Sequence, residues 1–155
     1  MTAPPTDDPL RTALRGLSTA DDAVREAAFA ALDRAETPVD AVAAVVASLD
    51  AAPDEQAQLA HLYVLHDILA NTRSACNTQT YAFRGAIEAV LPHVFETLQS
   101  GRKATRQIMR RTAFSEAVEE VLNIWSEWEV FSSEFIVNLS HRFLKANDEN
   151  INFIG

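Results

Sequence analysis

Cysteine, glycine and long apolar runs are scarce in this chain of 155 residues. The single cysteine, Cys76, excludes an intramolecular disulfide framework and a zinc site built from several cysteines. Four glycines and six prolines exclude a collagen-like repeat and a mainly disordered linker. The longest apolar run, residues 41–47, is far shorter than the roughly 18 residues of a membrane span. The N-terminus has two early acids and no apolar segment, which predicts a soluble intracellular protein or domain without a secretory signal.

Basic residues are also in deficit, and 13 Lys and Arg against 22 Asp and Glu give a net charge of −9. This balance argues against a general nucleic-acid coat and against a polybasic membrane adhesin. Residues 101–111 are the exception, because they hold five basic side chains and no acid. That segment is either a solubilising loop and helix end or the one local stretch that attracts an anion.

Apolar residues recur at helical spacing, and the period-two alternation of strands is absent. We therefore predict an all-α fold, a right-handed superhelix of seven to eight helices, because no sequence period of 30–45 residues indicates a tandem repeat. Pro92 should kink or split the fifth helix. The third helix should bury Val39, Val42, Val46 and Leu49. Caps and prolines predict helices over residues 8–16, 18–35, 37–51, 53–74 and 78–99. A sixth helix should start at Arg106 or Phe114 and end at Trp128, and Ser132-Ser133 should cap a last helix over residues 134–145.

Motifs of catalysis, metal binding and nucleotide binding are missing. The chain has no G-x-S-x-G, H-E-x-x-H, Walker or G-x-G-x-x-G pattern. His61 and His66 lie five residues apart, so on a helix they diverge by about 140° and cannot share a metal. We predict that the protein is not an enzyme and uses no cofactor.

Two segments carry more information than the rest. In the first, residues 59–74, Tyr63, Asp67 and Asn71 recur every four residues and share one helix face. Such a face can hydrogen-bond an extended peptide, or Asp67 and Asn71 can serve the fold by capping helices. In the second, residues 121–139, Trp125 and Trp128 form an aromatic stripe that we interpret as mostly core.

These segments resemble the CTD-interacting domain, the module that binds the C-terminal repeat tail of the largest subunit of RNA polymerase II. LYVLHDILAN at 62–71 matches the family's L-Y-x-x-x-D-x-x-x-N helix. VLNIW at 121–125 and EFIVNL at 134–139 match its V-L-x-x-W and F-[IL]-x-x-L pair. The resemblance covers residues 8–145, between a flexible N-terminus at 1–7 and a flexible tail at 146–155. Residues 25–36 and 77–98 are similar to the SURP-motif splicing proteins associated with the U2 small nuclear ribonucleoprotein.

The resemblance implies eight helices, with a peptide groove formed mainly by the second, fourth and seventh. The ligand it implies is the repeat YSPTSPS, phosphorylated at its second or fifth residue, in a nuclear protein that couples transcription to splicing or 3′-end processing. Spliceosomal proteins are possible further partners, whereas membranes are not, and RNA binding should be weak at most. Carried over by position, the peptide contacts are Tyr63, His66, Asp67, Asn71 and Asn123, and the phosphate contacts are Arg25 and Arg73.

Glu120 departs from the family pattern. Members that recognise phosphate at the second heptad residue carry Arg directly before V-L-x-x-W, and a carboxylate repels phosphate. Two alternatives stay open for this reason: a scaffold domain that has lost its peptide site and binds another nuclear protein, and a trafficking adaptor of the related VHS/ENTH class.

Overall fold

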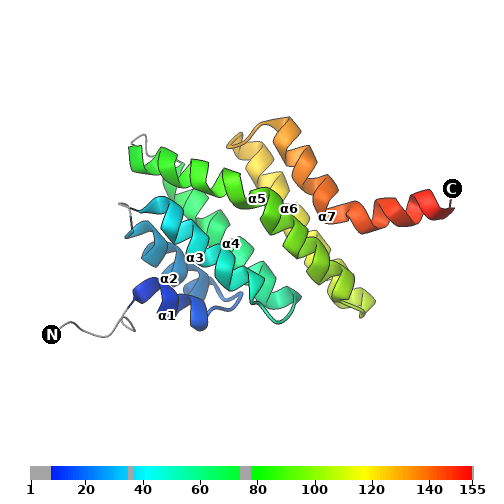
Figure 1. Cartoon of the computed structure of the whole chain (residues 1–155), viewed down its shortest axis with the longest axis horizontal. Coiled ribbons are helices and arrows are strands. Elements are labelled where there is room, and N and C mark those ends of the chain that lie inside the picture. The colour runs from blue at the N-terminus through cyan, green and yellow to red at the C-terminus, as the bar shows by residue number, and fades with distance from the viewer. Residues whose placement is uncertain (1–7, 35–36, 74–77, 155) are drawn as a thin grey trace.

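Seven helices make up the part of the chain that the structure describes, a computed structural model covering residues 8–34, 37–73 and 78–154 (Figure 1). Within those ranges no strand occurs, which confirms the all-α prediction. Cys76 and the N-terminal segment predicted to be flexible, 1–7, lie outside the described residues. The helices are α1 (Pro9–Arg15), α2 (Asp21–Leu32), α3 (Pro38–Asp50), α4 (Glu55–Thr72), α5 (Thr78–Ala104), α6 (Ile108–Trp128) and α7 (Ser133–Ile154).

Helix α4 lies at the centre of the molecule and packs against α2, α3, α5 and α6 (Figure 1). Its buried positions form an almost continuous apolar stripe that includes Leu62, Leu65, Ile68 and Leu69. Helix α5 connects the two ends of the fold, because it packs against α3 on one side and α7 on the other. Among the described helices, none is both long and apolar enough to cross a membrane. The buried polar positions of α4 face several neighbours, because His61 Nε2 lies 2.7 Å from the Ser48 hydroxyl of α3 and Glu55 pairs with Arg110 of α6.

Side-chain caps are present at the starts of α1, α4 and α7, whereas α2, α3 and α6 begin without a side-chain cap hydrogen bond. Ser132 caps α7 as predicted, because its hydroxyl accepts a hydrogen bond from the Phe135 backbone N–H at 3.1 Å. Two starts were predicted wrongly. Helix α2 begins after Ala20 because the Ser18 hydroxyl accepts from the Ala20 N–H instead of capping the helix. Helix α4 takes Asp54 as its cap, one residue after Pro53, because the carboxylate accepts from the Ala57 N–H at 2.9 Å.

The buried face of α3 is rotated from the predicted one. Val39 is 66% exposed, whereas Val45 is buried together with Ala41, Val42 and Leu49. Helix α3 packs against both α4 and α5, and the small Ala41 side chain suits such a crowded contact. Contacts with α4 and α5 therefore decide which of the apolar positions of α3 are buried.

Pro92 does not split α5, which runs unbroken from Thr78 to Ala104. The residues around the proline, Leu91, Val94 and Phe95, are fully buried, so packing on both sides holds the backbone helical. Helix α7 likewise continues beyond the predicted end at Lys145, to Ile154. Because α5 stays whole, the V-L-x-x-W segment lies on the sixth helix instead of the seventh.

Candidate functional site

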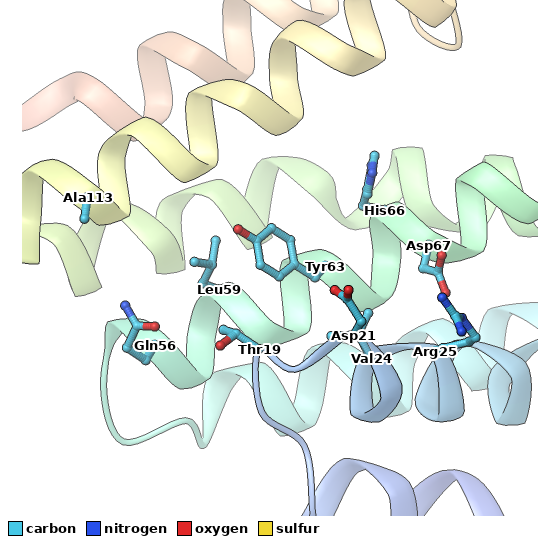
Figure 2. Close-up of a pocket in the computed structure, with 10 residues that line it drawn as sticks. All are labelled: Thr19, Asp21, Val24, Arg25, Gln56, Leu59, Tyr63, His66, Asp67 and Ala113. Carbon is cyan, nitrogen blue, oxygen red and sulfur yellow. The ribbon is translucent and has the colours of Figure 1, made fainter.

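A groove of about 650 Å³ lies between α4, the start of α2 and the first half of α6 (Figure 2). Helix α4 supplies its floor with five residues, each of which lies three or four positions from another, and this spacing places them on one helix face. The other two elements supply its walls. The lining residues are Thr19, Asp21, Val24, Arg25, Gln56, Leu59, Tyr63, His66, Asp67 and Ala113.

Tyr63 crosses the middle of this groove (Figure 2). Its ring is half-buried, and burial raises the pKa of the phenol above its ordinary value of about 10. The hydroxyl therefore stays protonated at neutral pH and can both donate and accept a hydrogen bond. Its neighbour Leu59 adds an apolar surface one helical turn earlier. This part of the groove suits a peptide group flanked by an apolar or aromatic side chain.

Opposite charges meet at one end of the groove. Arg25 of α2 and Asp67 of α4 point toward each other in Figure 2. Among the described residues neither takes part in an ion pair or a side-chain hydrogen bond with another side chain. Both groups are therefore free to bind a ligand, Arg25 as a donor and Asp67 as an acceptor.

His66 links the groove to the core. Its Nδ1 accepts a hydrogen bond from the Trp125 indole N–H at 3.0 Å, and its ring stacks on Trp128 with centroids 5.2 Å apart and planes 9° apart. Burial lowers the pKa of His66, and the Asp67 carboxylate opposes this in part. Because Nδ1 is the acceptor, the neutral ring carries its proton on Nε2. Trp125 is fully buried, so the orientation of the His66 ring depends on the core.

Two predicted peptide contacts lie outside the groove. The Asn71 amide donates to the backbone carbonyl of Asp67 at 2.8 Å, so the side chain folds back along its own helix. Asn123 lines a separate hollow between α6 and α7, together with Glu119 and Ile136. The structure thus brings Tyr63, His66, Asp67 and Arg25 together, but neither asparagine joins them.

Arg73 and Glu120 lie near the groove but do not line it. The guanidinium carbon of Arg73 is 4.1 Å from the centroid of the Trp128 ring. Glu120 is exposed on α6, seven residues after Ala113, and two helical turns place both on nearly the same face of α6. A carboxylate therefore follows the α6 wall where a ligand would continue past Tyr63.

Sequence reasoning missed the contribution of Trp128, Thr19 and Gln56. The aromatic stripe was interpreted as mostly core, and Trp125 is indeed core, but Trp128 is only half-buried and stacks on His66. The spacing gave no signal, because residues three apart share one helix face and both tryptophans were compatible with the core. No sequence pattern identifies Thr19 or Gln56 as residues of the groove.

A protein-family model described as the CID domain matches residues 8–139 of the chain. Two curated relatives from Arabidopsis thaliana are similar over nearly the whole chain. Protein RRC1 is 29% identical over 92% of this chain, and Protein RRC1-like is 30% identical over 91%. In both comparisons the aligned region is 15% of the relative's length, so the chain corresponds to a small part of each.

Proposed function

The chain belongs to the CID domain family, a family of protein-interaction modules, and on that premise we propose that it binds phosphorylated heptad repeats of the RNA polymerase II tail. The observation that carries the proposal is the groove itself, in which the Tyr63 phenol, two carboxylates and the Arg25 guanidinium surround an open channel on the central helix. Binding of this kind needs no catalytic group, and we propose that the module is non-catalytic.

Each groove residue has a role in this proposal. Tyr63 packs against the repeat's tyrosine or proline and hydrogen-bonds its backbone. Asp67 accepts a hydrogen bond from a hydroxyl or N–H of the peptide turn, and Arg25 binds a phosphate near the start of α2. His66 lines the groove beside them, and because its Nδ1 accepts from Trp125, its Nε2–H is the group that can donate to the peptide. Asn71 and Asn123, which do not line the groove, would contribute only if the peptide extends beyond it.

Glu120 sets the expected selectivity. An exposed carboxylate on the face of α6 that continues the groove wall disfavours a phosphate at that point. We propose that phosphate at the second heptad residue is bound poorly there, and that a phosphorylated repeat is instead held from the Arg25 end.

The same proposal includes three further points. The protein is nuclear, it links transcription to pre-mRNA splicing or 3′-end processing, and it is like the SURP-motif splicing proteins. The domain boundary, with the module at residues 8–145, is also part of the proposal. Because the chain aligns with 15% of each relative, spliceosomal proteins are proposed as partners of any longer protein that contains it.

The test is a titration of fluorescently labelled diheptad peptides, unphosphorylated or phosphorylated at one position, followed by anisotropy. Affinities should be micromolar or weaker because ordering a flexible peptide costs free energy. Asp67→Ala should weaken binding of every form, since it removes an acceptor in the groove. Asp33→Ala, an exposed acid outside the groove, is the matched control.

Glu120→Arg gives the opposite perturbation. It should strengthen binding of the form phosphorylated at the second residue and leave the unphosphorylated peptide nearly unchanged. Equal affinity of the wild-type domain for all forms at low salt would contradict phosphate recognition. Failure to bind any peptide, with the fold intact, would favour the second candidate, a scaffold domain for another nuclear protein, which the position of Glu120 makes worth testing.

A further inference from the structure

A second hollow of about 510 Å³ lies at the corner where α4 begins, α5 ends and α6 begins. It shares no lining residue with the groove. The connection between α3 and α4 and the connection between α5 and α6 border it, and both fall wholly within the described ranges. Its chemistry is therefore independent of the phenol and the carboxylates that line the groove.

A buried carboxamide without a hydrogen-bond partner lines this hollow. Gln58 is only 8% exposed, and its Oε1 atom has no partner among the described residues. The carboxamide fits against Gly101 of α5, where a Cβ atom would collide with it. Since almost every buried polar atom in a folded protein is hydrogen-bonded, an unpaired acceptor beside a hollow indicates a ligand group that can donate to it.

Donors and positive charge lie at the start of α6, beside the same hollow. Gln107 precedes α6 without a side-chain cap hydrogen bond, so no cap supplies an acceptor for the first backbone N–H groups of this 21-residue helix. Arg106 is exposed and forms no ion pair within the described ranges. The positive end of the helix dipole adds to the field of this guanidinium. A carboxylate is the group that matches such a helix start.

The two acids of the hollow are already engaged by the fold. Glu55 pairs with Arg110, and Asp54 caps α4 by accepting a hydrogen bond from the Ala57 N–H. The basic segment 101–111 therefore dominates the local charge at this corner, although the chain as a whole has a net charge of −9.

Two large apolar side chains are exposed in the first turn of α6. Ile108 is 70% exposed and Met109 is 86% exposed. Methionine suits a binding surface because its unbranched side chain adapts to the shape of a partner. A phosphate group offers no apolar contact to this pair and no N–H to Gln58, whereas a peptide supplies both. The combination of groups thus favours a peptide over the backbone of a nucleic acid.

We propose that this corner, formed by Gln58, Arg106, Ile108 and Met109, is a docking surface for an acidic peptide segment of another protein that carries a large apolar side chain. A carboxylate of the segment binds at the start of α6 beside Arg106, and the apolar side chain packs on Ile108 and Met109. A backbone N–H of the segment donates to Gln58 Oε1. The inference goes beyond the proposed function, because neither the groove nor the polymerase tail takes part in it.

The experiment is a titration of the isotope-labelled domain, followed by amide NMR, with a short synthetic peptide of glutamates around one leucine and one phenylalanine. The side-chain amide of Gln58 and the first backbone N–H groups of α6 should shift, whereas the amides of Tyr63 and Asp67 should not. Two matched peptides should bind more weakly: one with glutamine in place of each glutamate, and one with serine in place of the leucine and the phenylalanine. Binding of the glutamate peptide should weaken with added salt.

Variants of exposed residues separate the charge from the apolar contact. Arg106→Gln should weaken binding of the glutamate peptide about 3-fold, as expected for one exposed ion pair. Met109→Ser should weaken it about 5-fold through lost apolar contact. Arg11→Gln on α1 and Val39→Ser on α3 change exposed residues of similar type elsewhere, and both should match wild type. Circular dichroism verifies the fold of each variant.

Several outcomes would overturn the inference. Equal affinity for the glutamate and glutamine peptides would show that charge is not recognised, and shifts confined to the groove around Tyr63 would place the peptide elsewhere. Absence of binding at millimolar peptide would also refute the docking surface. Tighter binding of a uridine oligonucleotide, lost in Arg106→Gln but kept in Met109→Ser, would identify a nucleic-acid site instead. None of these results depends on the diheptad titration, so this inference and the proposed function can fail separately.

Discussion

The hydrogen bond between Trp125 and His66 can be tested by changing the acceptor. Trp125 is fully buried, and its indole N–H donates to His66 Nδ1 at 3.0 Å. His66→Leu has a similar volume and no acceptor, so it leaves the indole N–H without this partner. His66→Gln keeps a carbonyl oxygen on a flexible stem and can restore part of the bond.

The magnitude follows from two contributions. A buried donor left without an acceptor costs about 1–3 kcal/mol. Loss of the stacked contact between His66 and Trp128 adds about 0.5–1.5 kcal/mol. His66 is half-buried, so water can reach part of the vacated space and reduce the first cost. We expect His66→Leu to lower the free energy of unfolding by about 2 kcal/mol, and His66→Gln by about half as much.

The hydrogen bond between Trp125 and His66 should also make the free energy of unfolding depend on pH. Burial lowers the pKa of His66 in the folded state. Below about pH 6.5, the ordinary value for histidine, the unfolded chain then binds more protons than the folded one. The free energy of unfolding should fall as the pH falls, because a protonated ring presents an N–H to the indole N–H. The neighbouring Asp67 carboxylate acts against this by stabilising the charged ring.

The assay is urea unfolding monitored by far-ultraviolet circular dichroism, at several pH values between 5 and 8. The difference between wild type and His66→Leu should shrink as the pH falls. His61 is buried and its pKa is also lowered, but it is present in both proteins and cancels from the difference. A double-mutant cycle with Trp125→Phe, which lacks the N–H, should give a coupling of about 1 kcal/mol. A coupling near zero would refute the assigned role of the bond.

Three further predictions concern ion pairs and the helix proline. Arg110→Ala should lower the free energy of unfolding by about 2 kcal/mol, because Glu55 is only 3% exposed and loses its partner. Adding Glu55→Gln should recover part of that loss in the same urea assay. Pro92→Ala should raise the thermal midpoint, because α5 regains a backbone hydrogen bond worth about 1–3 kcal/mol with relief of the ring clash. Arg34→Ala should raise the pKa of Asp8, which the hydrogen bond from Arg34 lowers, as carbon NMR titration of the carboxyl would measure. The stability lost in that variant at neutral pH should disappear as the pH falls through the pKa of Asp8.

The sequence predicted those parts of the fold that depend on neighbouring residues. The Ser132 cap is a local hydrogen bond, and its position could be predicted from the residue type alone. The continuity of α5 through Pro92 could not, because it depends on the burial of Leu91 and Phe95 by helices distant in the sequence. Of the two effects predicted for Pro92, the split is absent because tertiary packing keeps α5 continuous, and the kink stays a prediction.

The candidate site could be predicted where its residues lie within about one turn of the same helix, because the rotation between them is then small. Asp67 lies about 40° around the helix from Tyr63, so both line the groove, whereas Asn71 has rotated by about 80° and leaves it. Asn123 is displaced from Ala113 on α6 by a similar angle and faces α7. The contact of His66 with two tryptophans joins positions about 60 residues apart, and no local pattern encodes it.

The location of free cations, more than the net charge of −9, decides where this acidic protein can bind an anion. Within the basic segment 101–111, Arg110 pairs with Glu55, and Arg102 donates to the Ser115 hydroxyl and lies over Phe143. These two arginines serve the fold through specific contacts, a role that neither interpretation of that segment predicted. Arg25 and Arg73 instead present donors with no acid bound to them among the described residues. An anionic peptide should therefore be held by a few positioned arginines, which predicts weak binding with a modest dependence on salt.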